Sequence, residues 1–119
     1  MRKFILIILI NLFFGDFSLL NSQCPPNDVI LSTQADVNNF VQNYPNCSQI
    51  NGILEIGSIL WGFDSDVNDI SGLTSIQSAY EVYINGTKLT SLDGLNNLKT
   101  IMNSLSIYDN EFLEDILAL

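Results

Sequence analysis

The sequence contains no histidine and is poor in bases, with four Lys and Arg against 13 Asp and Glu in 119 residues. Histidine is the most frequent general base in enzymes and the most frequent metal ligand. No Ser or Cys is paired with a plausible base that would activate it as a nucleophile. We therefore expect no catalytic site, no metal and no cofactor. Nucleic acid and anionic lipid are bound through clustered Lys and Arg, so a net charge of −9 argues against both as partners.

Cysteine is also scarce, because the chain has only Cys24 and Cys47. An even number in an exported chain suggests a disulfide. This bond would close a loop of about 24 residues and stabilise the fold by about 3–4 kcal/mol in the chain-entropy model. Two unpaired thiols are the alternative. Without histidine, two cysteines cannot complete a zinc site unless carboxylates join them.

A long apolar run occurs only at the start of the chain, in residues 4–14, directly after two bases. A charged start, a short apolar centre and a small residue near the end are typical of a secretory signal peptide. We assign residues 1–22 to this peptide. A membrane span is disfavoured, because Asn11 and Asp16 interrupt a run that would need about 20 apolar residues. A lipid anchor on Cys24 is another alternative.

Export places the protein outside the cell or on its surface, with membrane contact only through an uncleaved signal segment. Cleavage removes Arg2, Lys3 and Asp16, and two bases and one acid taken from a net charge of −9 leave −10. Such a charge keeps chains apart in solution unless a specific surface brings them together.

The middle of the chain, residues 76–98, reads as one unit of a repeat. It opens with apolar residues at every second position, which is the pattern of a strand, and Asn85-Gly86 follows as a turn. Leucines then recur every three residues, and the Ser, Asp, Gly and Asn between them favour turns over helix. We expect a strand, a corner and an irregular return with inward leucines. The strand positions are Tyr80, Val82 and Ile84, and the leucines are Leu89, Leu92, Leu95 and Leu98.

Imperfect copies of this unit precede and follow it, with a period of about 22–26 residues, which lies in the range of solenoid repeats. A single coil cannot bury its own apolar face, so the coils are expected to stack into a β-solenoid. The strand alignment places Leu54 and Leu105 beside Tyr80, and Ile56 and Ile107 beside Val82. The return alignment places Val67, Ile70 and Leu73, and then Leu113, Ile116 and Leu119, beside Leu89, Leu92 and Leu95. The expected core comprises Leu54, Ile56, Leu73, Val82, Ile84, Leu92, Leu95, Leu105 and Ile107.

The segment before the repeats has a different pattern. Residues 28–31 form a short strand candidate, and Ser32 or Thr33 caps a helix that runs to about Asn43. We divide the chain into a signal peptide at 1–22, a strand–helix cap at 23–49, and about three repeats at 50–119, the last of them truncated.

Two stretches resemble a known family. Residues 46–56, NCSQINGILEI, resemble the beginning of the L domains of epidermal-growth-factor and insulin receptors. Residues 89–101, LTSLDGLNNLKTI, resemble the repeat unit of secreted L-domain-like proteins of Gram-negative bacteria. The resemblance implies a right-handed, single-stranded β-helix related to leucine-rich repeats, a role in binding at the cell surface, and an N-terminal fragment of a longer protein.

Aromatic side chains are the candidate ligand contacts. Tyr83 and Tyr108 are expected to hold the same outward place on consecutive strands and to stack as a ladder. Trp61 and Phe63 lie in an insertion between repeats, and such a bulky pair either folds back over the solenoid or marks a contact surface. Mutual packing on a solvated sheet is the alternative for the tyrosines.

The same insertion ends in an acidic run, and Asp64, Asp66, Asn68 and Asp69 could offer oxygens to calcium. Their spacing begins like that of a calcium loop. The loop lacks the glycine expected at its sixth position, and Ser75 replaces the glutamate expected at the twelfth. A solvated acidic loop is the alternative.

These features together favour a non-enzymatic exported module that binds a protein or glycan ligand at the cell surface. A structural spacer or a truncated piece of a longer adhesin is one alternative, and a carbohydrate-binding appendage of a secreted enzyme is another. The last coil has nothing to cover its apolar face, so we also expect self-association at the C-terminal edge.

Overall fold

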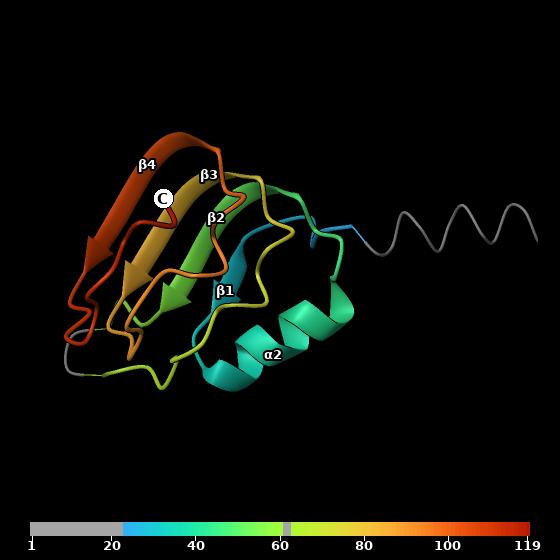
Figure 1. Ribbon diagram of the computed structural model, residues 1–119. Helices are drawn as coiled ribbons and strands as arrows, with labels where there is room; N and C mark the ends of the chain where they lie inside the picture. The colour runs from blue at the N-terminus through green and yellow to red at the C-terminus, as the bar shows by residue number, and fades with distance from the viewer. Residues whose placement is uncertain (1–22, 61–62) are drawn as a thin grey trace, which may run out of the picture.

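The computed structural model describes residues 23–60 and 63–119, so the expected signal peptide and Trp61 lie outside the described residues. Four parallel strands form one sheet in the order of the chain (Figure 1). A helix connects the first two strands. The returns between the other strands are irregular where they are described, at residues 58–60 and 63–77 after β2 and at 86–99 after β3. The elements are β1 (Val29–Leu31), α2 (Gln34–Asn43), β2 (Gln49–Gly57), β3 (Ser78–Asn85) and β4 (Thr100–Tyr108).

The β-solenoid expected from the repeats, a right-handed single-stranded β-helix, is wrong. The described chain has a single four-stranded, all-parallel sheet and one short helix. Within the described residues the returns form no second row of strands, because short local turns interrupt them: Leu73 N donates to Ile70 O at 3.0 Å, and Leu95 N donates to Leu92 O at 3.1 Å. Neighbouring segments on this side are joined by separate backbone bonds, such as Lys88 N to Val67 O at 2.8 Å, and by an isolated bridge between Ser91 and Asp115. Leucines spaced by three therefore make successive turns that cover one face of the sheet.

The register of the strands also differs from the expected one. Leu54 and Leu105 both pair with Val82, two residues beyond Tyr80. The ladder also has an irregularity between Ala79 and Glu81, where the neighbouring strands each take one extra residue. This irregularity changes the register by one residue only, so it is not the source of the two-residue difference. Ala79 and Val82 are both buried, so the strict alternation that placed Tyr80 inside is broken, and Tyr80 is exposed.

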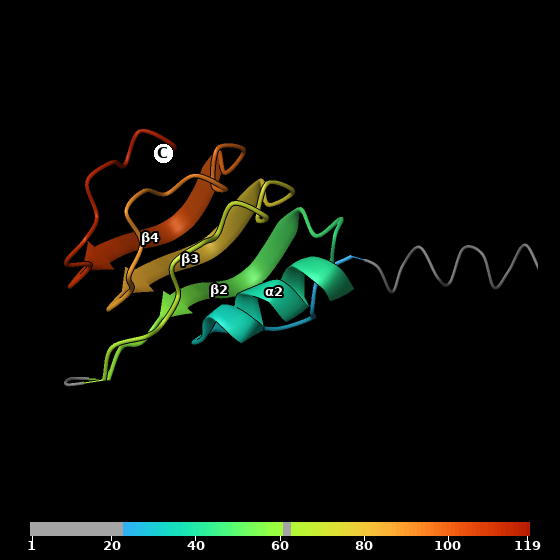
Figure 2. The ribbon, with the colours of Figure 1, turned by 60° about the horizontal axis from the view of Figure 1, so that its bottom comes forward.

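The inner face of the sheet and the leucines of the returns form one core. Seven of the expected core residues are confirmed as buried: Leu54, Ile56, Leu73, Val82, Ile84, Leu92 and Leu95. The last strand is different, because Leu105 is 45% exposed whereas its partner Val82 is 0% exposed. The C-terminal segment lies beyond β4 on the return side (Figure 2), and it leaves that strand's inner face partly open.

The strand and helix expected before the repeats are confirmed. Thr33 caps α2: its side-chain oxygen accepts from Asp36 N at 3.1 Å, and an Asp36 oxygen accepts from Thr33 N at 3.1 Å. The disulfide between Cys24 and Cys47 is confirmed and joins the lead-in of β1 to the segment before β2. Within residues 23–60 and 63–119, no helix is long and apolar enough to cross a membrane.

Candidate functional site

The outer face of the sheet, opposite the returns, carries side chains of β2, β3 and β4 in register. Alternation along a strand sends every second side chain outward, so the face is organised in rows across the strands. One row contains Glu55, Tyr83 and Ser106, which pair across the three strands. The row before it contains Ile53, Glu81 and Ser104.

A groove of about 500 Å³ crosses this face. Its walls combine two isoleucines and two tyrosines with one carboxylate and one serine hydroxyl. This composition suits a ligand with both apolar and polar parts. The lining residues are Ile53, Glu55, Ile59, Tyr83, Ser106 and Tyr108.

Tyr83 and Tyr108 both line the groove, but they do not form the expected ladder. Tyr83 pairs with Ser106, and Tyr108 pairs with Asn85. The two tyrosines therefore sit diagonally on neighbouring strands, one row apart. The error has the same source as the register of the core, because a shift of two residues keeps each side chain on its face but changes its neighbour.

Glu81 is held by its neighbours on the outer face. Tyr83 Oη donates to Glu81 Oε2, and Asn103 Nδ2 donates to Glu81 Oε1 at 2.6 Å. The hydrogen bond from Tyr83 and then that from Asn103 lower the pKa of Glu81, since both stabilise its charged form. The same bond to Glu81 raises the pKa of Tyr83. Tyr83 is thus fixed in place by its hydroxyl, and its ring is left to face the groove.

Glu55 is in a different position, because no hydrogen bond reaches its carboxylate from the described residues. Burial raises its pKa, and the nearby charge of Asp28 raises it further. Asp28 is itself anchored, since its Oδ1 accepts from Ile53 N at 2.9 Å. Glu55 is therefore the carboxylate in the groove that a ligand can engage.

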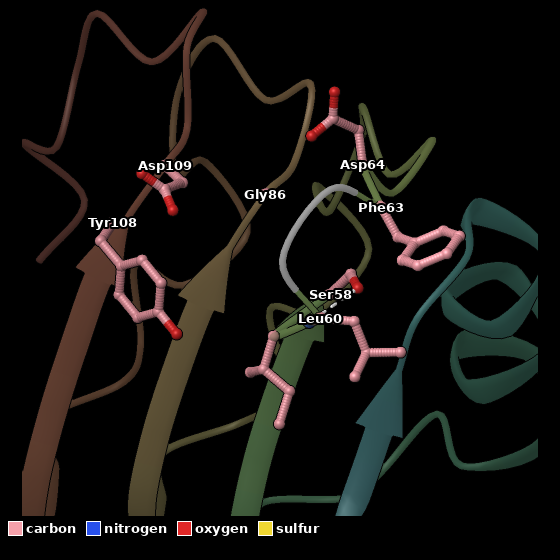
Figure 3. A pocket seen from close by; sticks show the side chains of 8 residues that line it. Ser58, Leu60, Phe63, Asp64, Gly86, Tyr108 and Asp109 are labelled. Carbon is pink, nitrogen blue, oxygen red and sulfur yellow. Dashed lines mark hydrogen bonds between the residues drawn. The ribbon is translucent and has the colours of Figure 1, made fainter.

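Phe63 lies apart from the groove. It is exposed and lines a small cavity of about 50 Å³ at the carboxyl ends of β2 and β3, together with Ser58, Gly86 and Tyr108. Figure 3 shows Phe63 and Tyr108 on opposite sides of this cavity, so their rings do not stack. Trp61, the other aromatic expected at this site, lies outside the described residues.

The acidic loop does not gather its carboxylates. Asp66 Oδ1 accepts from Gln34 N at 2.9 Å, and Asp69 Oδ1 accepts from Ser71 N at 2.9 Å. Both carboxylates are therefore engaged in hydrogen bonds with backbone N–H groups. The hydrogen bonds from Ser71 lower the pKa of Asp69. Asp64 instead lines the small cavity beside Gly86. Among the residues that the structure describes, no group of three or more His, Cys, Asp or Glu side chains is placed to hold a metal ion.

Sequence reasoning missed three residues of this face: Ile53, Ile59 and Asn103. Ile53 lies within the stretch that resembles the receptor L domains, and Asn103 lies where β4 takes its extra residue. Ile59 stands in the insertion, where no periodicity indicates a direction.

Comparison with protein-family models, curated proteins and solved structures found no match. The groove over β2, β3 and β4 is therefore the basis for a functional proposal.

Proposed function

We propose that this protein is a non-enzymatic, exported binding module whose ligand occupies the groove on the outer face of the sheet. The main observation that supports this proposal is the groove itself, where Tyr83 and Tyr108 present aromatic surface beside Glu55 and Ser106. Aromatic side chains offer large contact area at a low cost in conformational entropy. Tyr83 is also pre-ordered by its hydrogen bond to Glu81, which lowers the cost of binding further.

Export is supported by two features of the chain. The Cys24–Cys47 disulfide fits an oxidising compartment, and the first 22 residues have the order of a secretory signal peptide. The resemblance of residues 89–101 to the units of secreted L-domain-like proteins supports a role in surface binding. The ligand on this proposal is a protein or glycan of the cell surface.

The test is a binding screen of the disulfide-bonded protein on a glycan array and on an array of cell-surface proteins. The Tyr83→Ala/Tyr108→Ala double variant should lose every positive signal. Tyr80→Ala is the matched control, because Tyr80 is an exposed tyrosine of the same strand that does not line the groove. Ligands that bind the double variant as well as the wild type would refute the proposal. A complete lack of ligands would favour the structural spacer.

Self-association is a second candidate, favoured by the exposed Leu105 on β4. This strand is at the edge of the sheet, and its nine residues include no charge and no proline, the features that normally protect an edge. Two copies that pair through β4 would form one continuous sheet, in which the exposed apolar side chains of the two β4 strands lie next to each other. Sedimentation at micromolar concentration should show dimers, and Met102→Lys, at an exposed position of β4, should release monomers. A monomeric wild type would contradict this candidate.

A further inference from the structure

We propose that the groove recognises an arginine or lysine side chain of a partner polypeptide, with Glu55 as its counter-charge and Tyr83 as the aromatic surface beside it. This inference rests on the proposed function, because it names the chemistry of the ligand for the same groove.

The outer face carries acids without bases. Glu55 and Glu81 point outward from β2 and β3, and Asp28 is close enough to influence the pKa of both. The two lysines of the described chain, Lys88 and Lys99, lie in the return between β3 and β4 and do not line the groove. Like charges placed together without a counter-ion repel each other, so a bound cation would relieve a cost that the free protein carries.

The hydrogen bonds of the two glutamates indicate that Glu55 is the one that contacts the ligand's cation. Both oxygens of Glu81 accept hydrogen bonds, from Tyr83 and from Asn103. Glu55 receives none from the described residues and lines the groove. An arginine or lysine that pairs with Glu55 would form charge-assisted hydrogen bonds.

Tyr83 completes the recognition of a cation. It pairs with Glu55 in the strand register, so its ring and the carboxylate are neighbours on the same face. A guanidinium or ammonium group is attracted to an aromatic face, and the interaction is stronger when water is excluded. Because the Tyr83 hydroxyl is committed to Glu81, the ring does not have to be ordered when the ligand arrives.

The apolar surroundings favour a polypeptide over a small polyamine. Ile53 and Ile59 line the groove together with the acid, and Ile30, the neighbour of Glu55 on β1, is exposed. A free polyamine would leave these side chains in water. An extended segment that alternates basic and apolar residues would place its charge on Glu55 and its aliphatic side chains on the isoleucines.

The probe for this inference is a capped, fluorescently labelled peptide that alternates arginine and isoleucine, titrated with the full disulfide-bonded protein. The Glu55→Gln variant, which keeps the shape of the side chain, should weaken binding by about tenfold, since it removes a charge-assisted contact. Glu114→Gln is the matched control: it makes the same change in net charge at an exposed position on the C-terminal segment, outside the groove. Its affinity should stay within about twofold of the wild type.

Three results would overturn the inference: equal weakening by Glu55→Gln and Glu114→Gln, equally tight binding of a peptide with glutamine in place of arginine, or equally tight binding of spermidine. Failure here is distinguishable from failure of the proposed function. If binding of an array ligand depends on Tyr83 and Tyr108 but not on Glu55, the groove is the binding site, and the proposal that Glu55 pairs with a cationic side chain of the ligand is wrong.

Discussion

Truncation of Leu92 to alanine is the sharpest test of how the returns stabilise the sheet. Leu92 lies in the return between β3 and β4, and its side chain is 0% exposed. The change removes three carbons, and burial of each is worth about 0.8 kcal/mol, so the transfer term alone is about 2.4 kcal/mol. A cavity adds to this loss when the site cannot collapse.

Collapse is restricted at this position, because the backbone of Leu92 is bonded on both sides. Its N–H donates to Asp115 O at 3.3 Å, and its carbonyl accepts from Leu95 N at 3.1 Å. We therefore expect Leu92→Ala to lower the free energy of unfolding by about 3–4 kcal/mol, within the range of buried leucine truncations. For a domain whose total stability is about 5–15 kcal/mol, this is a large fraction.

Urea unfolding followed by circular dichroism measures the effect, with Leu117→Ala as the control. Leu117 is 90% exposed, so its truncation should change the free energy of unfolding by less than about 0.5 kcal/mol. A loss below about 1 kcal/mol for Leu92→Ala, or a loss equal to that of the control, would show that the returns do not pack on the sheet as described.

Three further predictions concern other parts of the fold. Gly94→Ala should destabilise the protein by at least about 2 kcal/mol, because Gly94 has a φ of +117° and a Cβ there would lie 1.8 Å from Ile70 O; a variant as stable as the wild type in urea would contradict this. Replacing Cys24 and Cys47 by serine should cost about 3 kcal/mol, and two thiols that alkylate without reductant would refute the bond itself. Glu55→Gln should raise the melting temperature at pH 7 and leave it unchanged at pH 3. Folding raises the pKa of Glu55, so ionisation of this side chain destabilises the folded state as the pH rises above about 4.5. A variant with a lower melting temperature than the wild type at pH 7 would contradict this direction of the pKa shift.

The sequence predicted which residues are buried better than it predicted the fold. Val82 and Ile84 are in the core because period two determines the face of a strand, and a register error of two residues leaves that face unchanged. The neighbours across strands do depend on register, so the pairing of Tyr83 with Tyr108 was wrong. No residue pattern marks the irregularity beside Tyr80, since it arises from how three strands pair.

The architecture was harder to predict, because spacing alone does not distinguish turns from short strands. The leucines of the returns recur as expected and are buried, yet their backbones close local turns and do not form a second sheet. Turns and helix caps were predicted more reliably than the architecture, because they depend on a few neighbouring residues. Gly86 has the positive φ expected of an Asn-Gly turn, at +60°, and Thr33 caps the helix.

The candidate site was predicted only in part. Tyr83 and Tyr108 were identified from their outward positions, but their role depends on Glu55 and Asn103, which come from neighbouring strands. Spacing does not reveal the bond from Asn103 to Glu81, nor that no described side chain donates to Glu55, because each depends on which side chains the sheet places side by side.

The location of the ligand on the folded protein decides whether the outer face of the sheet is the binding site. Backbone amide shifts of the labelled protein should be recorded while each ligand identified on the arrays is added. We expect the largest changes at the outward positions of β2, β3 and β4, around Glu55, Tyr83 and Ser106, with little change in α2. Changes concentrated in α2 or in residues 113–119, with the outer face unaffected, would contradict it.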